Sequence, residues 1–148
     1  SPEYIDSIKA VSAKKMYDTV IKEYKDADIT FMTAAVADYT PAMPSKQKIK
    51  KSDNLNLELK RTKDIIKELG KKKNSDQILI GFAAESENLK GNALQKIEKK
   101  NLDFICANNL NVSGKDDTEI LVLGKGTEIK LIGSKFSVAH KIIDIIIK

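Results

Sequence analysis

The sequence has 148 residues, 41% of them hydrophobic and 32% charged, and this length and balance predict a single soluble globular domain. Its one cysteine, Cys106, excludes an internal disulfide and most thiolate metal sites. No apolar run approaches the ~20 residues of a membrane span and no secretory signal opens the chain, so we expect a cytoplasmic protein without a membrane anchor.

The net charge of +5 comes almost wholly from lysine, because Arg61 is the only arginine. Proteins that bind nucleic acids favour arginine, whose planar guanidinium pairs with phosphates and guanine edges through two hydrogen bonds. Four phenylalanines, four tyrosines and no tryptophan also provide few rings on which single-stranded bases could stack. Two interpretations stay open: lysines spread over a solvated surface, or a basic patch that binds a phosphate-rich ligand.

Periodicity predicts a helix and then a strand in the first third of the chain. Apolar residues recur at helical spacing over 12–21, and Ser12 is suited to cap this helix. Residues 29–37 are apolar on both faces, as in a central parallel strand. At Asp38 the strand gives way to a proline-containing loop, followed by the lysine-rich stretch 46–51.

Strands and helices alternate along the rest of the chain. A short strand is predicted over 55–59, and Thr62 is placed to cap the helix that follows and ends near Lys72. The remaining predictions are strands over 77–85 and 103–107, a helix over 88–100, a hairpin over Glu119–Ile132 and a helix over 135–147. This alternation predicts an α/β domain with a Rossmann-like, mostly parallel sheet flanked by helices and with a C-terminal β-hairpin.

Ligand-binding residues are expected where the parallel strands end, because open α/β sheets bind ligands beyond the carboxyl ends of their strands. The three predicted exits, at 34–38, 82–85 and 107–109, combine small and polar residues. Asp38 is placed to orient a ligand or to bridge a Mg²⁺ ion, and an aspartate that only begins a turn is equally compatible. For Glu85 the alternative is capping of the next helix.

Two groups of lysines are candidates for binding phosphate. The first lies in the loop after Asp38: Lys46, Lys48, Lys50 and Lys51. This loop is either a solvated basic turn or a mobile cover that closes over a polyphosphate. The second group, Lys96 and Lys100, lies at the margin of the apolar stripe of its helix. These two residues are either ordinary surface lysines or a pair that binds a triphosphate. Ser/His/Asp, HExxH, CxxC and Walker A patterns are lacking, so hydrolase and zinc chemistries are poorly supported.

Five short stretches follow one another in an order typical of one enzyme family. They are AAVADY at 34–39, KIKK at 48–51, GFAAE at 81–85, KKNLD at 99–103 and AN at 107–108. Each is unspecific alone, but together they extend over most of the sequence from Ile8 onward. The chain resembles the CTP-dependent phosphopantothenate–cysteine ligase, the synthetase half of the bifunctional bacterial enzyme of coenzyme A biosynthesis.

The resemblance implies a two-step ligation that uses CTP and Mg²⁺. The carboxylate of 4′-phosphopantothenate attacks the α-phosphate of CTP, which releases pyrophosphate and leaves an acyl-cytidylate. The amino group of L-cysteine then displaces CMP and forms the amide. The protein would contribute mainly positioning and neutralisation of charge.

The resemblance also assigns roles to individual residues. Lys48 corresponds to the catalytic lysine of a flexible strap that covers the intermediate. The contacts to CTP fall on Met32, Thr33, Ala34, Asp38, Lys48, Lys63, Asp64, Ile65, Ile66, Phe82, Lys96 and Lys100. The contacts to phosphopantothenate fall on Ala34, Ala35 and Asn108. The family's Asn-Pro-Asp pattern is replaced here by Thr62-Lys63-Asp64.

Several expectations about partners follow from the same resemblance. The family suggests a homodimer, with the Glu119–Ile132 hairpin as its interface, and a flavin-dependent decarboxylase domain in the parent chain. Nothing before Ile8 matches the family's glycine-rich strand–turn–helix, so residues 1–148 are expected to form a single synthetase domain that lacks this segment. Neither a nucleic acid nor a membrane is expected as a partner. Two alternatives stay open: a Rossmann-like module that binds nucleotide without catalysis, and a basic nucleic-acid-binding domain.

Overall fold

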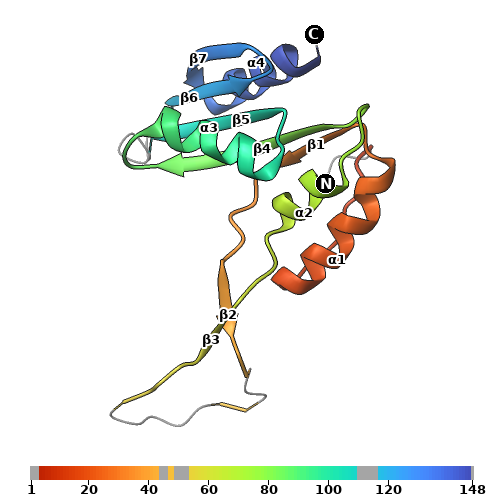
Figure 1. Ribbon diagram of the computed structural model, residues 1–148, viewed down its shortest axis with the longest axis vertical. Helices are drawn as coiled ribbons and strands as arrows, with labels where there is room; N and C mark the ends of the chain where they lie inside the picture. Colours follow the sequence, from red (N-terminus) through yellow and green to blue (C-terminus); the bar gives the residue numbers. More distant parts are fainter. Residues whose placement is uncertain (1–3, 44–46, 49–53, 110–116, 148) are drawn as a thin grey trace.

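Figure 1 shows a computed structural model of the protein, which describes residues 4–43, 47–48, 54–109 and 117–147. Its centre is a five-stranded sheet in the order β1-β4-β5-β6-β7. The strands are β1 (Ile29–Met32), β4 (Ile78–Glu85), β5 (Phe104–Asn109), β6 (Asp117–Gly124) and β7 (Thr127–Ser134). β1, β4 and β5 are parallel, and the β6–β7 hairpin extends the same sheet in antiparallel orientation. The α/β fold with a C-terminal hairpin is confirmed.

Helices cover both faces of this sheet (Figure 1). They are α1 (Ala13–Glu23), a 3-10 turn (Tyr24–Asp26), α2 (Ile65–Lys72), α3 (Leu89–Lys100) and α4 (Lys135–Ile147). Leu79 belongs to a core that packs with α1, α2 and α3, whereas the next residue, Ile80, belongs to a second core that packs with α4. This is the alternation of a strand that is buried on both faces. None of the described helices has the length and apolarity needed to cross a membrane.

Capping side chains explain where the first two helices begin. Ser12 caps α1 as predicted, since its Oγ accepts a hydrogen bond of 3.1 Å from the amide of Lys15. The prediction that Thr62 caps the next helix is wrong. Asp64 has that role, with Oδ1 accepting from the amide of Lys67 at 3.1 Å. Thr62 instead donates through its hydroxyl to the carbonyl of Ala37 at 2.6 Å.

An arm of two antiparallel strands, β2 (Tyr39–Pro41) and β3 (Leu59–Arg61), extends away from the sheet (Figure 1). The strand predicted over 55–59 is therefore displaced toward the end of that segment. Leu55 and Leu57 alternate with polar residues, but both are more than half exposed, and neither belongs to a core cluster of the described residues. Outside the described residues lie three lysines of the predicted basic loop: Lys46, Lys50 and Lys51.

β1 is shorter than predicted and lies at the edge of the sheet formed by the described residues, not at its centre. The strand ends at Met32, and Phe31 is 38% exposed. Residues 33–37 continue the apolar run of the sequence but leave the sheet. Ala34, Ala35 and Val36 of this segment line a cleft that is described below.

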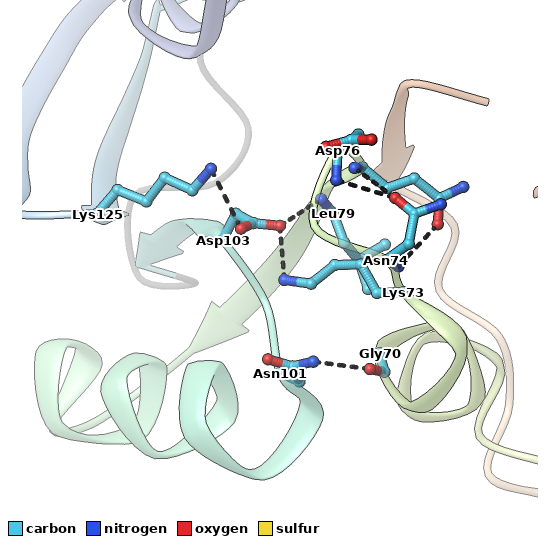
Figure 2. Close-up of polar contacts among 9 residues, drawn as sticks. Gly70, Lys73, Asn74, Asp76, Leu79, Asn101, Asp103 and Lys125 are labelled. Atoms are coloured by element: carbon cyan, nitrogen blue, oxygen red, sulfur yellow. Dashed lines mark hydrogen bonds and ion pairs between the residues drawn. The ribbon is translucent and has the colours of Figure 1, made fainter.

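A largely buried ion pair joins the amino ends of β4 and β5 (Figure 2). Oδ2 of Asp103 lies 2.8 Å from both Nζ of Lys73 and the amide of Leu79, and Oδ1 lies 3.3 Å from Nζ of Lys125. Burial alone would raise the pKa of Asp103, but the hydrogen bonds from Lys73 and Leu79 and the charge of Lys125 outweigh burial and leave it lowered. Asp103 thereby ties the start of β5 to the start of β4.

A close contact between α2 and α3 sets how these helices sit beside the cleft. Asn101 ends α3 with φ of 52°, and its Nδ2 donates to the carbonyl of Gly70 at 2.8 Å (Figure 2). A Cβ on Gly70 would lie 1.8 Å from the carbonyl oxygen of Lys100, so only glycine allows this approach. The contact places the C-terminal end of α3 against α2.

Candidate functional site

A cleft of about 180 Å³ lies beyond the carboxyl ends of β1 and β4. Its walls come from the segment after β1, the junction of β3 with α2, β4, and the end of α3. The lining residues are Met32, Ala34, Ala35, Val36, Asp38, Thr62, Lys63, Asp64, Ile65, Ile66, Phe82 and Lys100. We call it the carboxyl-end cleft. Sites for drug-sized ligands usually measure about 300–1,000 Å³, so the cleft accommodates part of a nucleotide.

The cleft brings together most of the residues that the resemblance assigns to ligand binding. Ten of those assigned residues line it: Met32, Ala34, Ala35, Asp38, Lys63, Asp64, Ile65, Ile66, Phe82 and Lys100. Thr33 lines two neighbouring grooves instead. Lys48, Lys96 and Asn108 do not line the cleft. Lys48 is exposed, and Asn108 lies within β5 between Ala84 and Ile120 of the adjacent strands.

The cleft combines accessible backbone with an aromatic surface. Ala34 and Ala35 have small side chains, which let a ligand approach the main chain closely. Phe82 is 38% exposed and presents a ring on which a planar base can stack. Ile65 and Ile66 form the first turn of α2, where backbone N–H groups and the helix dipole favour an anion. These features suit a ligand with a flat ring at one part and negative charge at another.

Formal charges within the cleft balance, because two lysines and two aspartates line it. Nζ of Lys100 lies 3.0 Å from Oδ2 of Asp64, and these side chains are 27% and 42% exposed. Nζ of Lys63 lies 4.2 Å from the centre of the Tyr17 ring, a cation–π contact. Asp38 forms no ion pair with any described residue. A polyphosphate bound here would therefore need further cations.

Lys96 lies one turn before Lys100 on α3 and forms an ion pair with Glu85, the last residue of β4. Glu85 also accepts a hydrogen bond of 3.1 Å from Nδ2 of Asn92. The hydrogen bond from Lys96 is the main cause of a lowered pKa at Glu85, while partial burial acts in the opposite direction. The structure thus gives Glu85 a role that the sequence did not predict: it holds Lys96 and does not cap the next helix.

The structure adds Val36 and Thr62 to the cleft, and neither was a sequence candidate. Val36 lies inside the AAVADY stretch and could have been found from its position there. Thr62 was misassigned as a helix cap, because its actual partner, Ala37, lies far away in the sequence. Among the described residues, no group of three or more His, Cys, Asp or Glu is arranged to hold a metal ion. The two carboxylates that line the cleft are Asp38 and Asp64.

Fold and cleft together define a Rossmann-like α/β domain with a ligand site at the carboxyl ends of its parallel strands. The family described as the DNA/pantothenate metabolism flavoprotein C-terminal domain matches residues 1–148, and the chain belongs to this family.

Individual relatives agree with this assignment. The coenzyme A biosynthesis bifunctional protein CoaBC of Bacillus subtilis (strain 168) is 42% identical over 135 residues, which cover 90% of this chain and 31% of that protein. The crystal structure of the C-terminal domain of a CoaBC protein has a TM-score of 0.80 and 34% identity, covering 97% of this chain and 65% of that one. A Cab2 mutant in complex with phosphopantothenate-cysteine shares the fold, with a TM-score of 0.71 at 13% identity, over 93% of this chain and 51% of that chain. The chain thus spans about a third of the CoaBC sequence of B. subtilis.

Proposed function

We propose that the protein acts in the ligation of 4′-phosphopantothenate to L-cysteine, with CTP as the activating nucleotide. The observation that carries this proposal is the gathering of ten assigned residues around one cleft. Membership of a family whose relatives are named for coenzyme A biosynthesis supports it. In the first step the substrate carboxylate attacks the α-phosphate of CTP and pyrophosphate leaves. In the second the amino nitrogen of cysteine attacks the acyl-cytidylate, and CMP leaves with the bonding electrons.

In this proposal the carboxyl-end cleft positions the nucleotide. The Phe82 ring and the first turn of α2, at Ile65 and Ile66, would hold the cytidine. The main chain at Met32–Ala34 would contact the nucleotide, with Ala34 and Ala35 also facing phosphopantothenate. A Mg²⁺ ion would supply charge neutralisation at the phosphates, and Asp38 is the carboxylate best placed to bind it because it forms no ion pair with a described residue.

Lys96 and Lys100 would bind the triphosphate by exchanging their present partners for phosphate oxygens. Their side chains are 41% and 27% exposed, and ion pairs in contact with water contribute little stability. A triphosphate carries several negative charges and outcompetes a single carboxylate for an ammonium group. Glu85 and Asp64 would then hold the two lysines in place before the nucleotide arrives.

Lys48 would act from the arm, as a cation that closes over the reacting groups. Its side chain is exposed, as expected of a residue in the open position of a moving segment. Closure would exclude water and strengthen the contact between its ammonium group and the developing charge. Asn108, on β5, remains a proposed contact to phosphopantothenate.

We also propose the setting in which the protein works: a cytoplasmic homodimer whose parent chain carries a flavin-dependent decarboxylase domain. The relatives named as bifunctional support the second domain. For the dimer we propose the hairpin β6–β7 as the interface, because Ile132 of β7 is 59% exposed. Sedimentation of the wild type and of an Ile132→Lys variant tests this, since a monomer in both would contradict it.

The ligase proposal is tested by supplying 4′-phosphopantothenate, CTP, L-cysteine and Mg²⁺, and measuring pyrophosphate and CMP separately. We expect pyrophosphate release without cysteine and CMP release only with it, and faster rates with CTP than with ATP. CTP binding without any turnover would select the non-catalytic nucleotide-binding module. A salt-dependent shift with DNA or RNA and none with CTP would select a nucleic-acid-binding domain.

Variants test the individual lysines. Lys96→Ala and Lys100→Ala should each raise the KM for CTP, whereas Lys99→Ala, on the same helix but bonded to Gln95, should leave it unchanged. Lys48→Gln should lower kcat far more than it weakens CTP binding, because a closing residue acts mainly in the transition state. Equal loss of both would identify Lys48 as an ordinary binding lysine.

A further inference from the structure

A second pocket, of about 270 Å³, lies between α1 and the base of the arm, beside the carboxyl-end cleft. The two share only Thr62 and Lys63. Its charged and aromatic lining residues are Lys14, Tyr17, Asp18, Lys60, Arg61 and Lys63. We call it the arm-base pocket. None of the sequence candidates except Lys63 lies in it.

The two pockets differ in charge. Four cationic side chains and one carboxylate line the arm-base pocket, whereas the carboxyl-end cleft is balanced. The carboxylate, Asp18, lies 2.6 Å from Nζ of Lys14, and this pair is 50–84% exposed. Such a pair contributes little stability and yields readily to a stronger anion. Lys60 forms no ion pair with any described residue.

The chain's single arginine lies in this pocket. Among 26 basic residues, only Arg61 offers a planar guanidinium, which binds phosphate through two parallel hydrogen bonds. Its Cζ lies 5.8 Å from the centre of the Tyr39 ring, across the β2–β3 pairing. Contact with the ring occupies the face of a guanidinium and leaves its N–H edge for an acceptor.

The pocket is also held in shape by the elements around it. Thr62 ties the end of β3 to the segment before the arm, through its hydroxyl to Ala37 and its amide to the carbonyl of Asp38 at 2.9 Å. Lys63 rests on the ring of Tyr17 from α1. The cations therefore come from α1, from β3 and from the residue that follows Thr62, and they do not form a run on one helix.

We infer that the arm-base pocket is a binding site for the phosphate group of a small phosphorylated molecule. Four cationic side chains around one concave space, with a guanidinium among them, provide the charge-assisted hydrogen-bond donors that a phosphate dianion requires. The phosphate comes either from a substrate that continues past Thr62 and Lys63 into the carboxyl-end cleft, or from a free phosphate ion. The assignment to a substrate phosphate rests on the proposed function, whereas the inference that the pocket binds phosphate does not.

Titration of the protein with inorganic phosphate, followed by two-dimensional NMR of its backbone amides, tests the site. We expect saturable shifts at Lys14, Tyr17 and Lys60. The double variant Lys60→Gln/Arg61→Gln should weaken phosphate binding at least about tenfold, because it removes charge-assisted hydrogen bonds. The matched double variant Lys67→Gln/Lys72→Gln removes the same charge from α2 outside both pockets and should change binding less than about twofold.

Shifts confined to Ala35 and Lys100 of the carboxyl-end cleft would overturn the inference, and so would equal binding by both double variants. A circular dichroism spectrum like that of the wild type confirms that each variant is folded. The source is then identified by comparing the affinities for 4′-phosphopantothenate and pantothenate. A preference for the phosphorylated form that the Lys60/Arg61 variant loses assigns the pocket to the substrate, and a preference that it keeps assigns the pocket to free phosphate. If the wild-type protein binds inorganic phosphate in this pocket but does not catalyse the ligation, only the proposed function is contradicted.

Discussion

At the amino end of the sheet, Lys73 and Asp103 form an ion pair whose side chains are each 11% exposed. At the carboxyl end, the Lys100–Asp64 pair is 27% and 42% exposed. Asp103 also accepts the amide of Leu79, so its charge is part of the strand register. Asp64 caps α2 through one oxygen and holds Lys100 with the other. The difference indicates that the first pair maintains the fold and that the second can exchange for a ligand.

The largest effect should follow from breaking the buried pair. Asp103→Ala leaves the Lys73 ammonium and the Leu79 amide without their partner, and we expect a loss of about 3–5 kcal/mol in the free energy of unfolding. Asp64→Ala, at the other end, should cost only about 1 kcal/mol, the value of a helix cap. Urea unfolding of both variants measures the two values. Equal losses would remove the distinction between the two ends.

A second substitution tests whether the α2–α3 contact is as tight as the structure indicates. Gly70→Ala places a methyl group 1.8 Å from the carbonyl of Lys100, and forcing the helices apart should cost roughly 1–3 kcal/mol. Gly91→Ala is the matched control, since its new methyl meets only the side chain of Asn88 and alanine favours a helix. In thermal unfolding, Gly70→Ala should have a lower Tm than the wild type, and Gly91→Ala should have an equal or higher one. Two unchanged Tm values would contradict the contact.

Acid should lower the stability of the protein because it protonates Asp103 at the amino end of the sheet. Because its folded-state pKa is lowered, its contribution to stability is present above the unfolded pKa of about 3.9 and is lost as the pH falls through the folded value. The wild type should therefore lose stability below about pH 4 more steeply than an Asp103→Asn variant, which cannot titrate there. Urea midpoints measured between neutral and strongly acidic pH compare the slopes. Parallel curves would show that Asp103 does not cause the acid sensitivity.

The smallest effect concerns Cys106, in the centre of β5. Burial raises the pKa of its thiol to about 12, so the folded protein keeps it protonated. The contribution of Cys106 to stability should be fully present below the unfolded pKa of about 8.5 and should be lost as the pH rises from there toward 12. Alkylation by iodoacetamide at pH 8 should be slow in native protein and fast in urea. Rapid alkylation of the native protein would contradict the burial of this strand.

Elements with a strong local signal could be predicted from the sequence. The α3 helix and the strands β4 and β5 were located correctly because their periodicity and small-residue exits are local properties. Prediction failed where distant residues decide the structure. β1 ends at Met32 although the apolar run continues, and Ala34, Ala35 and Val36 of that run line the cleft. Thr62 donates its hydroxyl to the carbonyl of Ala37 and does not cap a helix.

The candidate site divides in the same way. The family resemblance located ten residues of the cleft, because a resemblance assigns positions that periodicity and composition alone do not. The partners of those residues could not be predicted. The ion pair of Glu85 with Lys96 depends on the packing of β4 against α3, and the contact of Lys63 with Tyr17 depends on how α1 lies beside the junction of β3 with α2. The arm-base pocket was missed for this reason, since its cations are spread over separate elements.

The edge position of β1 also bears on the order in which the chain folds. β1 pairs only with β4 among the described strands, beginning at Ile29 with Ile78, so about fifty residues must close as a loop before this pairing forms. β4 to β7 connect through much shorter segments, which favours their earlier assembly. The amides of β1 should accordingly exchange with deuterium sooner than those of β5. The edge that borders the cleft is then the last to form and the first to open.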